Sequence, residues 1–205
     1  MKKNLWTGII GATFVLLASR PATAITISFQ PTATTLAIGG STAFDVIATR
    51  GVGEIISAFD FDLQYDPSII RATGVSFGNF LGDLNNFEAI TDSKLATAGL
   101  ADFAEVSLLT DLSLANLQSA TQFRLATISF DALAAGTSVL EMINYGVGGN
   151  DIKGANDVVL SPILEKGSIA VTGLTSVPEP STFILLSIGV LWLAVQRMLA
   201  SVRLD

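Results

Sequence analysis

The 205-residue sequence contains no cysteine and no histidine. These two absences exclude disulfides, thiol nucleophiles, Ser-His-Asp triads and the usual zinc sites. Charged residues make up only 14% of the chain, and acidic residues outnumber basic ones 18 to 11. Because an acidic surface repels nucleic-acid phosphates, we expect no nucleic-acid partner. Any site must therefore use carboxylates, hydroxyls, amides or a hard cation such as calcium.

Tryptophan is also nearly absent from the middle of the chain. Trp6 and Trp192 both lie in terminal apolar segments, which leaves Tyr65 and Tyr145 as the only tyrosines. Exposed Trp and Tyr rings commonly stack on the apolar faces of sugars. Tyr65 falls on the inward face of its predicted strand, whereas Tyr145 lies among glycines. The sequence therefore predicts no flat aromatic platform for crystalline polysaccharide, while polar recognition of soluble glycans stays open.

Residues 1–24 have the three parts of a secretory signal peptide. Lys2 and Lys3 form the basic region, residues 9–18 the apolar region, and Ala22 and Ala24 an A-x-A cleavage pattern. An N-terminal membrane anchor is the alternative, but the apolar region is too short to span a bilayer comfortably. We expect cleavage after Ala24, so that the mature chain begins outside the cytoplasm.

An apolar run near the other end predicts a transmembrane helix over about 182–202. A helix extended to residue 202 reaches about 30 Å, the thickness of the hydrocarbon core, and Arg197 can snorkel to the interface. Arg197 and Arg203 lie beyond the run and place the C-terminus in the cytoplasm. A buried helix of a soluble domain is the alternative, but the run lacks an amphipathic stripe.

The segment 176–205 resembles the PEP-CTERM sorting signal. The resemblance rests on Pro178, Glu179, Pro180 and Ser181, on the apolar helix after them, and on Arg197 and Arg203 near the end. It implies a Gram-negative-type envelope and an exosortase, a membrane processing enzyme that cleaves near residues 178–181. It also implies a link to exopolysaccharide or biofilm. The two arginines are spread out rather than clustered, so retention as a membrane anchor is the alternative to cleavage.

The segment 25–175 reads as one acidic β-domain. It carries sixteen acidic and six basic residues, a net charge of −10. Apolar and polar residues alternate over 44–48, 59–65, 126–130 and 169–171, which is typical of half-buried strands. Further strands are expected over 25–29, 70–77, 95–103 and 139–143, while 105–118 fits either a short helix or a strand with irregular loops. Many short strands indicate an all-β sandwich or barrel.

The same segment resembles cohesin domains. The resemblance rests on residues 58–70 (AFDFDLQYDPSII), 125–130 (LATISF), 167–171 (GSIAV) and 38–46 (IGGSTAFDV). It implies a jelly-roll β-sandwich related to carbohydrate-binding modules. It also implies a dockerin-like protein as partner, often within a polysaccharide-degrading assembly. Residues 81–122 have no clear counterpart in the family.

Two sets of acidic residues are candidates for chemistry. Asp60 and Asp62 lie two apart on a predicted strand, so both point to one face; a glycosidase pair is possible, but a solvated strand face is the simpler interpretation. A loop with Asn150, Asp151, Asn156 and Asp157 offers oxygens for calcium, although it lacks the EF-hand spacing and these are also ordinary turn residues. Asp83, Asn85, Asn86 and Glu88 form a second, weaker cluster of this kind.

Together these features predict an exported, non-catalytic β-sandwich protein of the cell surface or extracellular matrix. Its role would be adhesive or structural, linked to exopolysaccharide or biofilm. The alternative is a binding module that recognises a dockerin-like protein or a polysaccharide. No cofactor is expected, apart from calcium as the one candidate.

Overall fold

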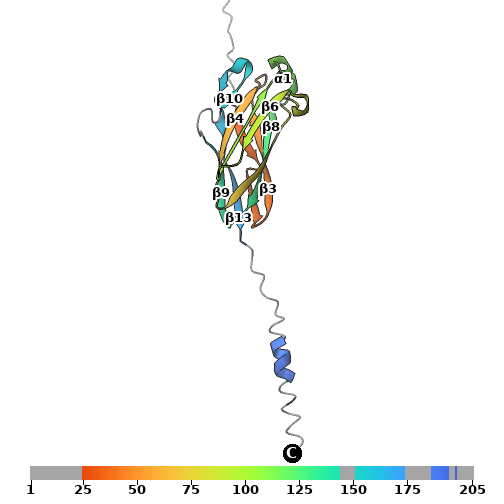
Figure 1. The fold of residues 1–205 in the computed structure, drawn as a ribbon, viewed down its shortest axis with the longest axis vertical. Helices are drawn as coiled ribbons and strands as arrows, with labels where there is room; N and C mark the ends of the chain where they lie inside the picture. Colours follow the sequence, from red (N-terminus) through yellow and green to blue (C-terminus); the bar gives the residue numbers. More distant parts are fainter. Residues whose placement is uncertain (1–24, 144–150, 174–185, 194–196, 198–205) are drawn as a thin grey trace, which may run out of the picture.

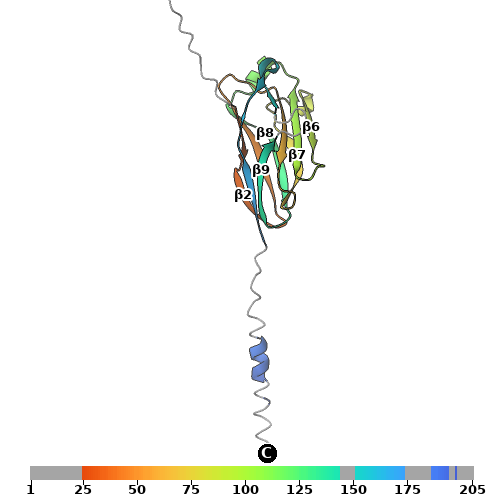
Figure 2. The same ribbon diagram turned by 90° about the vertical axis from the view of Figure 1, so that its left-hand side faces the viewer.

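The computed structural model describes residues 25–143, 151–173, 186–193 and 197. Figures 1 and 2 show two β-sheets packed face to face in an elongated sandwich, which confirms the predicted all-β sandwich. The first sheet has the strand order β12-β1-β3-β8-β5. The second has the order β11-β10-β4-β9-β13-β2, with β7 paired to β4 and β6 paired to β7.

The strands are β1 (Thr26–Gln30), β2 (Ala33–Ala37), β3 (Ser41–Thr49), β4 (Ala58–Gln64), β5 (Ile70–Phe77), β6 (Ala89–Lys94), β7 (Leu100–Ser107), β8 (Gln122–Ala132), β9 (Gly136–Ile143), β10 (Asp151–Lys153), β11 (Val159–Leu160), β12 (Ile163–Leu164) and β13 (Gly167–Thr172). The helical elements are η1 (Leu84–Asn86), α1 (Asp111–Leu117) and η2 (Ala155–Asp157).

The first sheet is organised around β8, which pairs with β3 on one side and β5 on the other. Phe44 and Val46 of β3 face the core, as do Ile128 and Phe130 of β8, and this confirms the alternation expected there. The pairing of β3 with β8 shifts by one residue between Val46 and Ile47. Such a bulge sharpens the local twist of the sheet and helps it wrap over its partner.

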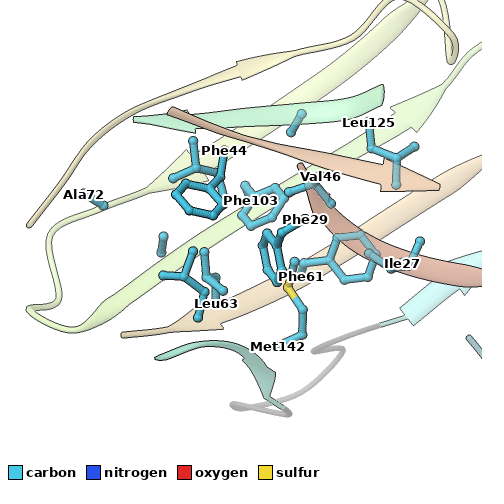
Figure 3. Close-up of a cluster of buried hydrophobic side chains, with 14 of the residues drawn as sticks. Ile27, Phe29, Phe44, Val46, Phe61, Leu63, Ala72, Phe103, Leu125 and Met142 are labelled. Atoms are coloured by element: carbon cyan, nitrogen blue, oxygen red, sulfur yellow. The ribbon is translucent and has the colours of Figure 1, made fainter. Parts of the chain in front are cut away.

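Aromatic rings fill the space between the sheets. Figure 3 shows Phe29, Phe44, Phe61 and Phe103 gathered there, and the ring centroids of Phe61 and Phe103 are 5.8 Å apart. Tyr65 is 5% exposed, as expected for its inward face. Every residue of the core cluster lies between residues 25 and 171. We therefore expect the segment 25–173 to fold as one domain.

The segment 81–122, which the sequence left without a counterpart, adds η1, β6, β7 and α1 to the sandwich. The ambiguous stretch 105–118 is both a strand and a helix: β7 continues to Ser107, and α1 follows, with the side chain of Thr110 accepting a hydrogen bond from the main-chain N–H of Ser113. The strand expected over 95–103 begins only at Leu100. Gly99 ahead of it has a φ of 82°, in the left-handed region, and this conformation ends the preceding loop.

Several predictions concern residues outside the described part of the chain. These are residues 1–24 with Ala22 and Ala24, the motif residues 178–181, Arg203 and Tyr145. Residues 186–193 of the predicted transmembrane helix are helical. Among the described residues, no helix is both long and apolar enough to cross a membrane.

Candidate functional site

The outer face of strands β6, β7 and β4 carries an ordered set of side chains. Because neighbours in register share a face of a sheet, the strand pairing places these side chains in three rows. The first row holds Ile90, Val106 and Ala58, the second Asp92, Ala104 and Asp60, and the third Lys94, Asp102 and Asp62. We call these nine residues the outer face.

Asp60 and Asp62 lie on this face together, as their spacing predicts. The expectation that both are solvated is wrong for Asp62, which is only 5% exposed. The reason is the position of β4 inside the sheet: β7 pairs along one edge of Asp62 and β9 along the other. Asp102 and Ile143 are its partners in register on the two sides, and neighbours on both sides leave it little contact with water.

Negative charge accumulates around Asp60. Burial raises the pKa of Asp60, and the carboxylates of Asp102, Asp62 and Asp151 raise it further, while Lys94 lowers it. The Lys94 ammonium lies 2.7 Å from Asp92 and 3.4 Å from Asp102. One cation is thus shared among several carboxylates, so this part of the face attracts a positively charged partner.

The first row of the outer face is apolar and open to solvent. Ile90 is 61% exposed and its cross-strand neighbour Val106 is 47% exposed. Contiguous apolar side chains that polar residues surround are typical of interaction sites. Sequence reasoning missed this row, because Ile90 is the only large apolar residue of β6 and gives no alternating pattern.

One carboxyl group faces the opposite way, into the sandwich. Glu105 of β7 is 1% exposed, pairs in register with the core residue Phe59, and has no hydrogen-bond partner at either carboxylate oxygen. Burial raises its pKa to about 7. Among the described residues it is thus a buried carboxyl group whose charged form is disfavoured in the folded state.

The residues predicted for calcium are dispersed. Asp151 lies in β10 opposite Asp60, whereas Asn156 and Asp157 belong to η2, where the main-chain N–H of Asn156 donates to the Asp111 carboxylate at 3.1 Å. Asn150 lies outside the described residues. Within the described part of the chain, no three acidic side chains gather closely enough to hold a metal ion. Calcium binding stays a prediction.

The second cluster of candidate calcium ligands, which is made of Asp83, Asn85, Asn86 and Glu88, forms a turn. The Asp83 carboxylate accepts hydrogen bonds from the Asn85 main-chain N–H at 2.9 Å and from the side-chain amides of Asn85 and Asn86 at 3.1 Å. The side chain of Glu88 accepts from the main-chain N–H of Asp83 at 2.9 Å. These oxygens therefore already serve the loop itself, which fixes the shape of η1.

Comparisons with known proteins match the fold alone. No protein-family model matches the sequence, and no curated protein matches it either. Among solved structures, a cohesin from Clostridium acetobutylicum is 20% identical, with a TM-score of 0.58, over 74% of this chain and 92% of that one. A type I cohesin from Clostridium thermocellum, solved in complex with a dockerin, is 14% identical, with a TM-score of 0.56, over 73% of this chain and 100% of that one.

A more distant organism has the same fold. A non-cellulosomal cohesin from the hyperthermophilic archaeon Archaeoglobus fulgidus is 10% identical, with a TM-score of 0.54, over 73% of this chain and 92% of that one. At such low identity the likeness establishes a cohesin-like β-sandwich. It does not by itself assign a ligand, because one fold serves many functions.

Proposed function

We propose that this domain is a non-catalytic binding module whose outer face docks a partner protein. The observation that carries the proposal is the exposed pair Ile90 and Val106 beside the acidic second and third rows. A partner that presents apolar side chains flanked by lysine or arginine matches this pattern in both polarity and charge.

A dockerin-like protein is the partner class that we favour. The matched cohesin from Clostridium thermocellum was solved with a dockerin bound, and the present domain has the same fold. A glycan partner on this same face is less well supported, because the face has no aromatic ring on which a sugar could stack.

A capture experiment with matched variants tests the docking face. The domain 25–173 is immobilised and exposed to secreted proteins of the native cell, once with calcium and once with chelator. Val106→Lys should abolish capture of the bound protein, whereas Val139→Lys should not. The two valines are 47% and 49% exposed, so the control matches the test position in residue type and burial. Equal capture by both variants would remove the outer face from the proposal.

We also propose that the chain is exported and held at the cell envelope or in the extracellular matrix. Lys2, Lys3 and the A-x-A pattern support export, and the Pro178-Glu179-Pro180 motif before an apolar run supports sorting by an exosortase. In this location a binding module has an adhesive or structural role beside exopolysaccharide. The C-terminus would face the cytoplasm until the tail is cleaved.

Mass spectrometry of the chain from fractionated native cells tests this location. The expected N-terminus is Ile25, and the expected C-terminus of the processed form lies within residues 178–181. Replacement of Pro178, Glu179 and Pro180 by alanine should leave the N-terminus unchanged and keep the tail attached. A chain that retains Met1 in the cytosolic fraction would contradict export.

A further inference from the structure

A pocket of about 350 Å³ lies beside the first sheet and shares no residue with the outer face. Its walls come from the end of β5, from the loop that holds η1, and from Arg124 of β8. This volume falls within the range of small-molecule sites and exceeds that of a single water. Its lining includes the polar side chains of Asn79, Asn85 and Arg124 and the apolar side chains of Phe77 and Leu84, so it offers hydrogen bonds as well as van der Waals contact.

Two glycines let the main chain come close enough to form the pocket. A Cβ atom on Gly78 would lie 2.2 Å from the main-chain oxygen of Arg124, and one on Gly82 would lie 2.7 Å from that of Glu88. Gly82 also has a φ of +145°, which other residues rarely adopt. Glycines at such positions mark a close approach of backbone to backbone or to a ligand.

The pocket presents polar side chains that other residues engage only in part. The Asn79 side chain is exposed and makes no hydrogen bond within the described part of the chain. The Arg124 guanidinium is 49% exposed, and its nearest acidic neighbour is Asp45 at 3.9 Å, beyond hydrogen-bond distance. Asn85 is held in place by Asp83, which accepts from its main-chain and side-chain N–H groups. The loop is therefore ordered before any ligand arrives, which lowers the entropic cost of binding.

The loop that forms one wall also carries a costly aromatic residue. Phe87 follows η1 directly, adopts the left-handed conformation with a φ of 58°, and is 83% exposed. The left-handed backbone conformation is unfavourable for a bulky residue, and the exposed ring of Phe87 is not packed to compensate for it. Phe87 does not line the pocket itself, but its ring is exposed on the same loop, two residues beyond Asn85, and is suited to stacking on the apolar face of a sugar that extends past the pocket.

We propose that this pocket binds a neutral saccharide unit through Asn79, Asn85 and Arg124, with Phe87 as the stacking ring. Paired donors and acceptors of amide and guanidinium groups match the neighbouring hydroxyls of a sugar ring. A neutral sugar is favoured over a uronic acid because Asp83 and Asp45 balance the single cation, and the whole domain is strongly acidic. The site is separate from the outer face and does not depend on a protein partner there.

An NMR titration of the domain 25–173 tests the site, with cellobiose and maltose as neutral probes and D-glucuronic acid as the acidic probe. We expect saturable shifts of the Asn79 and Asn85 side-chain amides and of the Gly78 and Gly82 main-chain amides with at least one neutral disaccharide. Asn79→Ala should weaken that binding by about tenfold, the value of one lost hydrogen bond. Phe87→Ala should weaken it to a similar extent, about tenfold, through the loss of stacking.

Asn116→Ala is the matched control, since Asn116 is an exposed asparagine of α1 that does not line the pocket. It should leave binding unchanged. Absence of saturable shifts with both neutral disaccharides would overturn the proposal, as would shifts confined to residues outside the pocket. Tighter binding of glucuronic acid than of either disaccharide would overturn the assignment to neutral sugars. The shift map of the unmodified domain decides the location even if a variant fails to fold.

Discussion

The guanidinium of Arg50 donates a hydrogen bond to the main-chain carbonyl of Gln118. This bond joins the loop after β3 to the end of α1, and the Gln118 side chain extends the connection. Its amide donates to the main-chain carbonyl oxygens of Ile56, at 2.7 Å, and Phe80, at 3.0 Å, and its oxygen accepts from the Ile56 N–H at 2.9 Å. Three loops are thus tied to one helix end at the same pole of the sandwich.

Gln118→Ala should lower the free energy of unfolding by about 2–4 kcal/mol. Gln118 is fully buried, so its removal leaves the N–H of Ile56 and two carbonyl groups without partners. Urea unfolding of the domain 25–173 measures the change. Asn116→Ala, two residues earlier on the exposed side of α1, should stay within about 0.5 kcal/mol of the unmodified domain. Similar values for the two variants would mean that the Gln118 contacts contribute little.

Glu105 should make the domain less stable as the pH rises from about 4.5 to about 7. Its pKa is raised from 4.5 to about 7 by burial. The folded state therefore keeps its proton up to about pH 7, while the unfolded chain loses it near pH 4.5. The stabilisation is complete below pH 4.5 and is lost as the pH rises to about 7, a change of about 3 kcal/mol. Urea unfolding at a series of pH values between about 5 and 8 measures this loss of stability.

Glu105→Gln should flatten this dependence and raise the free energy of unfolding at the alkaline end of the window. The pKa values of Asp66, Asp92 and Asp131 are lowered from 3.8, so these groups titrate below the window and do not mask the effect. Glu141→Gln replaces an exposed carboxyl on β9 and should keep the slope. If Glu105→Gln retained the full slope, another group would carry it.

Gly78→Ala should destabilise the domain by about 2 kcal/mol or more. The added Cβ atom would lie 2.2 Å from the main-chain oxygen of Arg124, and backbone gives way less easily than a flexible side chain. Gly74→Ala lies within β5, four residues earlier, where the added Cβ atom meets nothing within 4 Å, and should be neutral or stabilising by up to about 1 kcal/mol. Thermal unfolding of both variants compares the two positions directly. A neutral Gly78→Ala would show that β5 and β8 can separate at this point.

Asp60→Asn should raise stability slightly at pH 7. The pKa of Asp60 is raised by burial and by the carboxylates of Asp102 and Asp62, so its charged form is disfavoured in the folded state. We expect a gain below about 1 kcal/mol that shrinks as salt is added, because partly exposed charges are screened. Urea unfolding at low and high salt measures it.

Asp66→Asn is the opposite case and should lower stability. The Asp66 carboxylate accepts hydrogen bonds from the Ser68 main-chain N–H at 2.9 Å and from the Ser68 hydroxyl at 2.6 Å, which lowers the pKa of Asp66.

The prediction for Asp60 has its own contradicting outcome. A loss of stability from Asp60→Asn would contradict the repulsion among the carboxylates of the outer face.

The strands that the sequence predicted well are those with a clear period of two. β4 and β8 alternate over most of their length, so both their existence and their inward residues could be foreseen. β2 and β6 lack large apolar residues on one face, and β10, β11 and β12 are only two or three residues long. Such strands form because a neighbour supplies the hydrogen bonds, and that information is not local.

The candidate site likewise has one part that the sequence predicts and another part that it does not. The shared face of Asp60 and Asp62 follows from their spacing alone. The burial of Asp62 and the pairing of Ile90 with Val106 depend on which strands flank β4 and β7, and on the register between them. Register is set by the whole sheet, so no local pattern in the sequence could have joined these residues into one surface.

The two ends of the sandwich segment pair with each other in parallel. β1 runs beside β12, β2 runs beside β13, and Figures 1 and 2 show β13 ending at the pole opposite α1. A pull on the two ends in opposite directions therefore slides β2 along β13, so that their hydrogen bonds are loaded together in shear and not opened one after another. A module built this way resists tension along its length, which suits the proposed attachment of a partner at the cell surface.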